Sequence, residues 1–288
     1  MTSNTHHLTA SELDALIGAA IDAGAVILEI RARGHTVETK ADSSPVTEAD
    51  RAAEALIAER IAVSVPAIPM VGEEATYDGD LPDVGERFFL VDPLDGTREF
   101  TRGGDDFTVN IGLIVGGEPV AGVIFVPATG RLFWGIEGEG AWHADVVDGA
   151  RGVARPLGCR EAPSDRLVVV ASRSHRTPET DAFIDRFGTC DIVAAGSSLK
   201  FCTVAEGDAD LYPRMGPTMQ WDTAAGDAIL RAAGGRVVDL DGTPLGYGPI
   251  AGADGPDRFR NPYFVATGGM DPFPPGEGSD RRSNHRAG

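Results

Sequence analysis

Residues 91–100, Val-Asp-Pro-Leu-Asp-Gly-Thr-Arg-Glu-Phe, form the stretch from which the fold of this chain can be worked out. The five residues that lead into it, RFFLV at 87–91, are apolar and β-prone, which predicts a buried strand. Asp92 and Asp95 follow at the end of that strand, on either side of a proline that cannot continue a central strand. Gly96 then permits a tight turn.

The two carboxylates on this turn predict a cation site. Asp92 and Asp95 repel each other unless a proton or a cation lies between them. Paired hard oxygens on a rigid turn suit Mg²⁺, and Thr97 adds a hydroxyl beside them. An ordinary Asp-Pro or Asp-Gly surface turn is the alternative, and the rest of the chain decides between the two.

The composition is that of an ordinary soluble globular protein. The 288 residues are 42% hydrophobic and 24% charged, which suits one large domain or two packed halves. The net charge of −19 argues against nucleic-acid and membrane partners, and an anionic substrate would need cations as intermediaries. No apolar run is long enough to span a bilayer, and the polar N-terminus does not have the form of a signal peptide. Three cysteines without CxxC spacing predict reduced core residues and a cytoplasmic location.

The first half of the chain begins with two predicted helices. Thr9 and Glu12 fit a capping box, and apolar residues then recur at helical spacing up to Gly34. Residues 40–50 read as a polar loop that runs into a second helix, where Thr47 and Asp50 fit helix-start chemistry.

Strands dominate the rest of this half. A short apolar segment at 68–71 predicts a strand that delivers Glu73 at its end. Residues 107–142 predict an antiparallel meander because Gly- and Pro-containing turns separate strand-like runs at 109–115, 120–126 and 132–135.

After Gly152 the predicted strands and helices alternate. Strands are expected at 167–171, 192–194, 236–240 and 263–267, and helices at 177–187, 199–206 and 220–233. We therefore predict an α/β protein of mixed layers, with the site between its two packed halves. Residues 8–155 form an antiparallel α+β half with most metal ligands, residues 156–270 form an alternating α/β half with the substrate-binding segments, and residues 271–288 form a disordered tail.

The chemistry-bearing residues are carboxylates at strand ends and helix starts. The candidates are Glu73, Asp92 and Asp95, joined by Asp50 and Asp222. Oxygen-only ligands favour Mg²⁺ or Mn²⁺ over Zn²⁺, and several of them can hold two or three ions for phosphoester hydrolysis. Glycoside hydrolysis also uses paired carboxylates, but Asp92 and Asp95 lie too close for an acid and a base on opposite sides of a sugar.

Three motifs resemble those of the inositol monophosphatase superfamily of Mg²⁺-dependent, lithium-sensitive phosphatases. They are GEE at 72–74, DPLDGT at 92–97 and WDTAA at 221–225, in matching order and separation. The likeness covers residues 10–268 and implies an αβαβα sandwich. Further motifs, KxDxSPVTxAD at 40–50, GSSLKFC at 196–202 and LYPR at 211–214, resemble the 3′(2′),5′-bisphosphate nucleotidase branch. Arg98 departs from the lysine common in that branch and keeps the charge.

The resemblance implies roles for the acidic residues. Glu73, Asp92 and the Leu94 carbonyl would hold a first Mg²⁺. Asp92, Asp95 and Asp222 would hold a second, and Glu73 with waters a weaker third. Thr97, hydrogen-bonded to Asp50, would orient or deprotonate the attacking water. A helix N-terminal acid is the other interpretation of Asp222, and both can hold together.

The resemblance also places the substrate. Ser172 and His175 would contact the nucleotide, and Gly196 and Lys200 would flank its 5′-phosphate. Gly96, Thr97 and Ser198 complete the predicted substrate-binding residues. The Gly196-Ser197-Ser198 run at a helix N-terminus offers backbone N–H groups and hydroxyls suited to an anion. An ordinary helix start with a solvated lysine is the alternative, and His175 also fits a surface loop.

These interpretations predict a Mg²⁺-dependent phosphomonoesterase that converts adenosine 3′,5′-bisphosphate, a by-product of sulfate assimilation, into AMP and phosphate. The alternatives are the same chemistry on inositol, histidinol or sugar monophosphates, and a non-catalytic phosphate-binding or regulatory protein. The predicted partner is a small phosphorylated nucleotide, and a monomer and a homodimer remain open.

Overall fold

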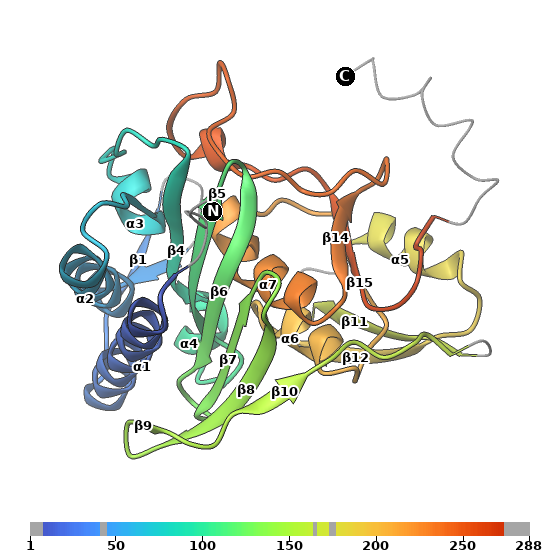
Figure 1. Ribbon diagram of the computed structural model, residues 1–288, viewed down its shortest axis with the longest axis horizontal. Coiled ribbons are helices and arrows are strands. Elements are labelled where there is room, and N and C mark those ends of the chain that lie inside the picture. The colour runs from blue at the N-terminus through green and yellow to red at the C-terminus, as the bar shows by residue number, and fades with distance from the viewer. Residues whose placement is uncertain (1–7, 41–44, 164–165, 173–176, 274–288) are drawn as a thin grey trace, which may run out of the picture.

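The protein is built from five layers, which Figure 1 shows edge on. The structure, a computed structural model, describes residues 8–40, 45–163, 166–172 (without the Ser172 side chain) and 177–273. The outer face of an eight-stranded sheet is covered by α1 (Ala10–Arg33) and α2 (Glu48–Ser64). Between this sheet and a five-stranded sheet lie α6 (Leu199–Ala205) and α7 (Gln220–Ala232). The far face of the five-stranded sheet is covered by α5 (Pro178–Asp185). The predicted αβαβα sandwich is confirmed.

The eight-stranded sheet carries the stretch that opened the sequence analysis. Its order is β10-β8-β7-β6-β5-β4-β3, with β9 paired to β8; the strands are β3 (Met70–Gly72), β4 (Arg87–Asp95), β5 (Thr108–Val115), β6 (Glu118–Val126), β7 (Arg131–Ile136), β8 (Gly140–Val147), β9 (Ala150–Arg151) and β10 (Arg155–Leu157). Only β3 and β4 pair in parallel. Since β3 and β4 run in the same direction, the carboxylates after both strands lie at the same end of the sheet.

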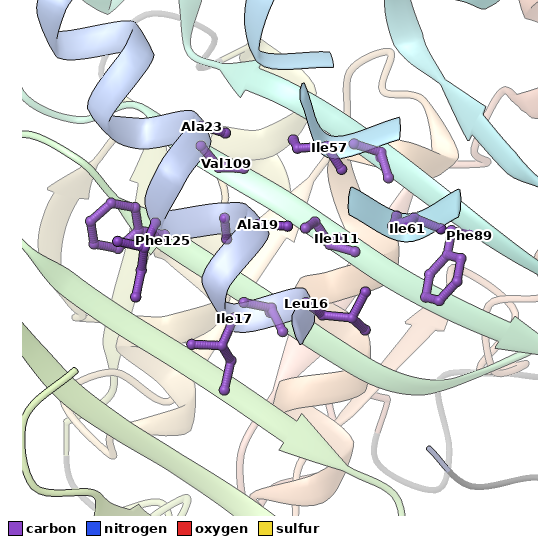
Figure 2. Close-up of a cluster of buried hydrophobic side chains, with 14 of the residues drawn as sticks. Leu16, Ile17, Ala19, Ala23, Ile57, Ile61, Phe89, Val109, Ile111 and Phe125 are labelled. Atoms are coloured by element: carbon purple, nitrogen blue, oxygen red, sulfur yellow. The ribbon is translucent and has the colours of Figure 1, made fainter. Parts of the chain in front are cut away.

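The outer face of this sheet packs on α1 and α2. The capping box is present at the start of α1, with Thr9 as the N-cap and Glu12 bonding back to it. Figure 2 shows the apolar cluster that follows, in which Leu16 and Ile17 of α1 and Ile57 of α2 lie with Val109 and Ile111 of the sheet. The outer face of the sheet is thus a conventional hydrophobic core.

A row of glycines brings α7 against the inner face. Gly112, Gly122 and Gly135 are direct neighbours across β5, β6 and β7. A Cβ atom at Gly112 would lie 2.7 Å from Cβ of Ala224, and one at Gly135 would lie 2.8 Å from Cα of Ile229. Because the strands carry no side chains there, α7 rests on the backbone of the sheet, and its first turn reaches the end where β3 and β4 stop.

The five-stranded sheet forms the second half. Its order is β12-β11-β13-β15-β14, made of β11 (Val168–Ser172), β12 (Asp191–Ala195), β13 (Leu211–Arg214), β14 (Arg236–Asp239) and β15 (Phe264–Thr267). The first three strands are parallel and β15 is antiparallel to both of its neighbours. A second apolar cluster joins this sheet to α6 and α7, and a third, smaller one joins it to α5.

Several short elements differ from the sequence analysis. The segment predicted as a polar loop at 40–50 instead contains β2 (Pro45–Thr47), which pairs antiparallel with β1 (Val37–Thr39) just before the segment. All three residues of β1 are exposed, so it has no apolar pattern. Two one-turn helices, α3 (Glu73–Tyr77) and α4 (Thr97–Thr101), and the 3₁₀-helix η1 (Gly255–Phe259) were also not predicted. Among the described residues, no helix is both long and apolar enough to cross a bilayer. Residues 274–288 of the predicted tail lie outside the described residues, so its disorder stays a prediction.

Candidate active site

The turn after β4 fixes the positions of Asp92 and Asp95. The pairing of β4 with β5 shifts register between these two residues, so the strand bulges where the proline lies. The Leu94 amide donates to Asp92 Oδ1 over 3.0 Å. Gly96 has a φ of +95°, and a Cβ atom on it would lie 2.9 Å from the carbonyl oxygen of Asp106. Only glycine fits this position, both for its backbone angle and for the space.

Three carboxylates from three elements converge at the end of the sheet. Glu73 begins α3 directly after β3, Asp92 ends the regular part of β4, and Asp222 lies in the first turn of α7. One carboxylate oxygen from each lies within 4.8 Å of the others. Asp95 lies beside them on the same turn as Asp92. We call Glu73, Asp92, Asp95 and Asp222 the carboxylate cluster.

The electrostatics of the carboxylate cluster favour a cation. Burial raises the pKa of Glu73, and it raises those of Asp92 and Asp222 well above their usual range. Repulsion among the neighbouring carboxylates raises them further. A buried set made only of oxygens has the chemistry that Mg²⁺ prefers, and a divalent ion would remove the repulsion.

Lys40 offsets part of this charge. Its Nζ atom lies 2.6 Å from Oε1 of Glu73 and 2.6 Å from Oε1 of Glu74. Burial alone would lower the pKa of Lys40, but the two carboxylates outweigh burial and raise it. The ammonium is therefore charged and serves Glu73 and Glu74; among the described residues no ion pair is recorded between a basic side chain and Asp92, Asp95 or Asp222.

Asp50 and Thr97 form the predicted pair beside the cluster. The Thr97 hydroxyl lies 3.1 Å from Asp50 Oδ1 and also 3.1 Å from the Leu94 carbonyl oxygen. Asp50 Oδ2 accepts hydrogen bonds from the backbone N–H and the hydroxyl of Thr47, each over 2.8 Å. Burial raises the pKa of Asp50, although these hydrogen bonds oppose the shift. A buried carboxylate of raised pKa is suited to receive a proton through Thr97.

A cleft of about 980 Å³ opens over these residues and extends to three cationic side chains of the second half, Lys200, Arg214 and Arg260. The carboxylate cluster, Thr97, Lys200 of α6 and Arg214 of β13 all line it. We call Lys200 and Arg214 the cationic pair. Burial, with a further contribution from Arg214, lowers the pKa of Lys200 to about 8. The Nε atom of Arg214 is buried and has no hydrogen-bond partner among the described residues.

Of the remaining predicted substrate residues, some line the cleft and others do not or lie outside the described residues. Gly96 and Ser198 line the cleft. The Ser198 hydroxyl lies 2.9 Å from Asp95, and the Gly196 backbone N–H donates to Asp106 over 3.1 Å. Ser172 ends β11, but its side chain and all of His175 lie outside the described residues. The structure thus brings the predicted metal and catalytic residues together, and places the predicted anion-binding turn beside them.

Sequence reasoning assigned no role to several residues that the structure brings to the site. Lys40 and Arg214 lay inside two of the quoted motifs, so their signal was present. Asn110, whose side chain lies beside Asp95, gave a different signal: it is a polar residue within an apolar strand.

Comparison with known proteins identifies the family. The model of the inositol monophosphatase family matches residues 9–264, so the chain belongs to this family of metal-dependent phosphatases, as its motifs indicated. The chain is 41% identical to the 3′(2′),5′-bisphosphate nucleotidase CysQ of Escherichia coli O157:H7, over 88% of this chain and 98% of that protein. It is also 41% identical to CysQ of Salmonella typhimurium, over 86% and 96% of the two chains. The crystal structure of CysQ from Bacteroides thetaiotaomicron superposes with a TM-score of 0.74 and 36% identity, covering 92% of this chain and all of that one.

Proposed function

We propose that this phosphatase is a Mg²⁺-dependent 3′(2′),5′-bisphosphate nucleotidase that converts adenosine 3′,5′-bisphosphate into AMP and phosphate. One observation carries the proposal: a single cleft holds both a carboxylate cluster suited to divalent ions and the cationic pair, of which Lys200 is buried. A monophosphate needs only the first. A substrate with two phosphates has a use for both, and the names of the CysQ relatives agree with this.

The carboxylate cluster is assigned to the ions. Glu73, Asp92 and the Leu94 carbonyl would hold one Mg²⁺, and Asp92, Asp95 and Asp222 a second, with Glu73 available to a third. Mn²⁺ has the same ligand preference. Bound there, the ions would activate the attacking water and stabilise the charge on the leaving oxygen. The protein's contribution is to hold four carboxylates at fixed positions despite their repulsion.

Asp50 and Thr97 are assigned to the attacking water. Because the Thr97 hydroxyl donates its hydrogen bond to Asp50 Oδ1, the threonine oxygen keeps lone pairs that can accept a proton from water. As that water attacks phosphorus, its proton passes to Thr97 and the threonine proton passes to Asp50. The bond between phosphorus and the 3′-oxygen breaks, and the 3′-oxygen takes a proton from solvent. The raised pKa of Asp50 favours its role as the acceptor.

The cationic pair and the preceding turn are assigned to the other end of the nucleotide. Lys200 and Arg214 would hold the 5′-phosphate, with Gly196 and Ser198 beside it; Ser172 and His175 are proposed to contact the nucleoside. Each charge-assisted contact contributes about 1.5–3 kcal/mol. A monophosphate of inositol, histidinol or a sugar has no second phosphate to form these contacts, so such compounds are the less favoured substrates.

The test is a matched pair of substrates that differ only in the 5′-phosphate. Phosphate release is measured from adenosine 3′,5′-bisphosphate and from adenosine 3′-phosphate, with inositol 1-phosphate alongside, in MgCl₂ and in EDTA. We expect release only with Mg²⁺, and a kcat/KM about ten- to a hundredfold higher for the bisphosphate. Equal values would contradict the nucleotidase assignment, and the absence of release from every substrate would indicate a binding protein.

The cysteines bear on the proposed location of the protein in the cell. The three cysteines are free thiols, which agrees with the proposed cytoplasmic location. Only Cys202 is fully buried, whereas Cys159 and Cys190 are partly exposed, so the prediction of three core cysteines was correct for one of them. A small phosphorylated nucleotide is the proposed partner, and sedimentation would distinguish a monomer from a homodimer.

A further inference from the structure

Two buried polar residues on β5 are not used by the reaction described above. Thr108 and Asn110 are both 0% exposed, in a strand whose eight residues are all buried. Val109 and Ile111 pack in the cluster with α1 and α2, so the alternation of the strand turns Thr108 and Asn110 to the inner face. Burying polar groups is unfavourable unless they form hydrogen bonds, so the partners of these two residues explain their presence.

Their partners are the serines before α6 and the carboxylate of Asp95. The Thr108 hydroxyl lies 2.8 Å from Asn110 Oδ1 and 2.6 Å from the Ser197 hydroxyl. Nδ2 of Asn110 lies 2.9 Å from the Ser198 hydroxyl and 3.5 Å from Oδ2 of Asp95. Both serine hydroxyls reach that same Oδ2, over 2.7 Å and 2.9 Å. Among the described residues every recorded donor to the Asp95 carboxylate reaches Oδ2, which leaves Oδ1 for a cation.

Counting protons shows what Asn110 does. A carboxylate only accepts, so the amide turns its N–H groups toward Asp95 and its oxygen toward Thr108. Since Asn110 donates to Ser198, the single proton of that hydroxyl must point to one of its two other neighbours, Asp95 Oδ2 or the Asp222 carbonyl, which lies 2.8 Å away. Asn110 thereby keeps Ser198 a donor, either to the Asp95 carboxylate or to the backbone carbonyl of Asp222.

The same turn also holds Lys200 of the cationic pair. Ser197 has a φ of +51°, a left-handed conformation that a serine adopts only at a cost. Its hydroxyl donates to Asp95 and lies 2.6 Å from the Thr108 hydroxyl, and its carbonyl oxygen accepts a hydrogen bond from Nζ of Lys200. A change in the position of Ser197 would therefore move both the support of Asp95 and the acceptor of Lys200.

We propose that Thr108 and Asn110 are positioning residues that hold the Ser197–Ser198 turn, and through it set the affinity for the metal at Asp95 and for the second anion at Lys200 together. This inference rests on the proposed function for the identity of the two ligands. The competing explanation is that the pair satisfies its own hydrogen bonds and contributes only to the stability of the fold.

The experiment measures two affinities by calorimetry, that of the protein for Mg²⁺ and that for AMP in saturating Mg²⁺. The variants are Thr108→Val, which removes a hydroxyl and little volume, and Asn110→Ala. Thr108→Ser keeps the hydroxyl and serves as the conservative rescue. Thr267→Val is the matched control, because Thr267 is also 0% exposed and its hydroxyl also donates a hydrogen bond, to the Met270 carbonyl, but it has no recorded hydrogen bond to the Ser197–Ser198 turn.

We expect Asn110→Ala to weaken the binding of Mg²⁺ by about tenfold or more. Thr108→Val should weaken both ligands by about two- to tenfold, the value of one hydrogen bond. Thr108→Ser and Thr267→Val should keep both affinities. Should Asn110→Ala fail to fold, the nearly isosteric Thr108→Val and its serine rescue carry the test alone.

Two outcomes would overturn the inference. Native affinities in folded Thr108→Val and Asn110→Ala would mean that the pair is only structural. A loss of Mg²⁺ affinity with unchanged AMP affinity would mean that Asn110 serves Asp95 alone and that the turn does not link the two ligands. If the native protein itself binds neither Mg²⁺ nor AMP, it is the proposed function that fails.

Discussion

The two charged regions of the cleft, the carboxylate cluster and the cationic pair, are built in contrasting ways. The cluster is assembled by backbone geometry: two parallel strands end together, Gly96 turns the chain, and the glycine row brings Asp222 on α7 to the same place. The cationic pair has no such local frame. Lys200 lies on α6 and Arg214 on β13 of the five-stranded sheet, so the distance between the two side chains depends on how α6 packs against β13.

Burial acts on both regions and drives them toward the same neutral state from opposite directions. It raises the pKa of Asp92 and Asp222, and it lowers the pKa of Lys200 to about 8. Each region therefore gains from a ligand of opposite charge, a cation in one and an anion in the other. The chain has only two lysines, Lys40 and Lys200, and each is buried beside one of these regions. Arginine supplies all the other fixed positive charge.

The largest effect is expected from the carboxylate cluster. Asp95→Asn keeps the shape of the side chain but removes the charge of a proposed metal ligand, so turnover should fall on the order of a thousandfold, equivalent to about 4 kcal/mol. Loss of repulsion should leave the metal-free protein at least as stable to heat. Initial rates at saturating Mg²⁺ measure the effect, with the exposed Asp105→Asn as control. Near-native rates would remove Asp95 from the metal site.

A smaller and more selective effect is expected from the cationic pair. Lys200→Ala should raise the KM for adenosine 3′,5′-bisphosphate by about ten- to a hundredfold, because one charge-assisted contact is lost. The KM for adenosine 3′-phosphate should change little, since that substrate has no 5′-phosphate. Steady-state kinetics on both substrates measure the difference. Equal losses on the two would place Lys200 at the carboxylate cluster or in the structural core.

The two regions should also differ in their response to pH. In the substrate-free protein the pKa of Lys200 is lowered to about 8. Its side chain is therefore charged below pH 8 and loses its charge as the pH rises above 8. The KM for the bisphosphate should therefore rise above pH 8, by at most about tenfold per pH unit. Lys200→Arg should show no such rise because arginine stays charged.

Selective ¹³C labelling of lysine gives a direct check of this prediction, because the chain can show only two lysine side-chain signals. One signal should titrate near pH 8. Two signals that both titrate above pH 10 would contradict the assignment.

A further effect is on the stability of the metal-free protein. Because the folded state raises the pKa of Glu73, Asp92 and Asp222, it binds more protons than the unfolded chain, and the metal-free protein should lose stability as the pH rises above about 4. Mg²⁺ should restore it, by about 2.7 kcal/mol at a hundredfold excess over Kd. That corresponds to about 5–10 °C in Tm. Melting curves in EDTA and in MgCl₂, with NaCl at equal ionic strength, test this; identical Tm values would contradict a resident cation.

The contrast between the regions also explains what the sequence could predict. The carboxylate cluster follows from local patterns, since Asp92 and Asp95 adjoin an apolar strand and Asp222 starts a periodic helix. The capping box of α1 and the meander from β5 onward were predicted for the same reason. What escaped prediction depends on partners distant in the chain. Asn110 is meaningful only next to Ser198, 88 residues later.

The missed elements have similar causes. β1 is exposed on every residue, so no alternation marks it as a strand. β13 contains Pro213, which disfavours a strand in any reading of the sequence alone, yet it pairs along its length with β15. The sequence revealed the composition of the turn at Gly196 but not the contacts of its serine hydroxyls. Those contacts depend on β5, which lies far away in the chain.

The position from which phosphate leaves tests the central claim most directly. If the carboxylate cluster holds the reacting phosphate and the cationic pair holds the other one, hydrolysis of adenosine 3′,5′-bisphosphate must yield 5′-AMP. ³¹P NMR of a reaction stopped at partial conversion distinguishes the two monophosphates. We predict that 5′-AMP accumulates in step with free phosphate. Accumulation of adenosine 3′-phosphate would mean that the nucleotide lies in the opposite orientation, and would contradict the assignment of both regions.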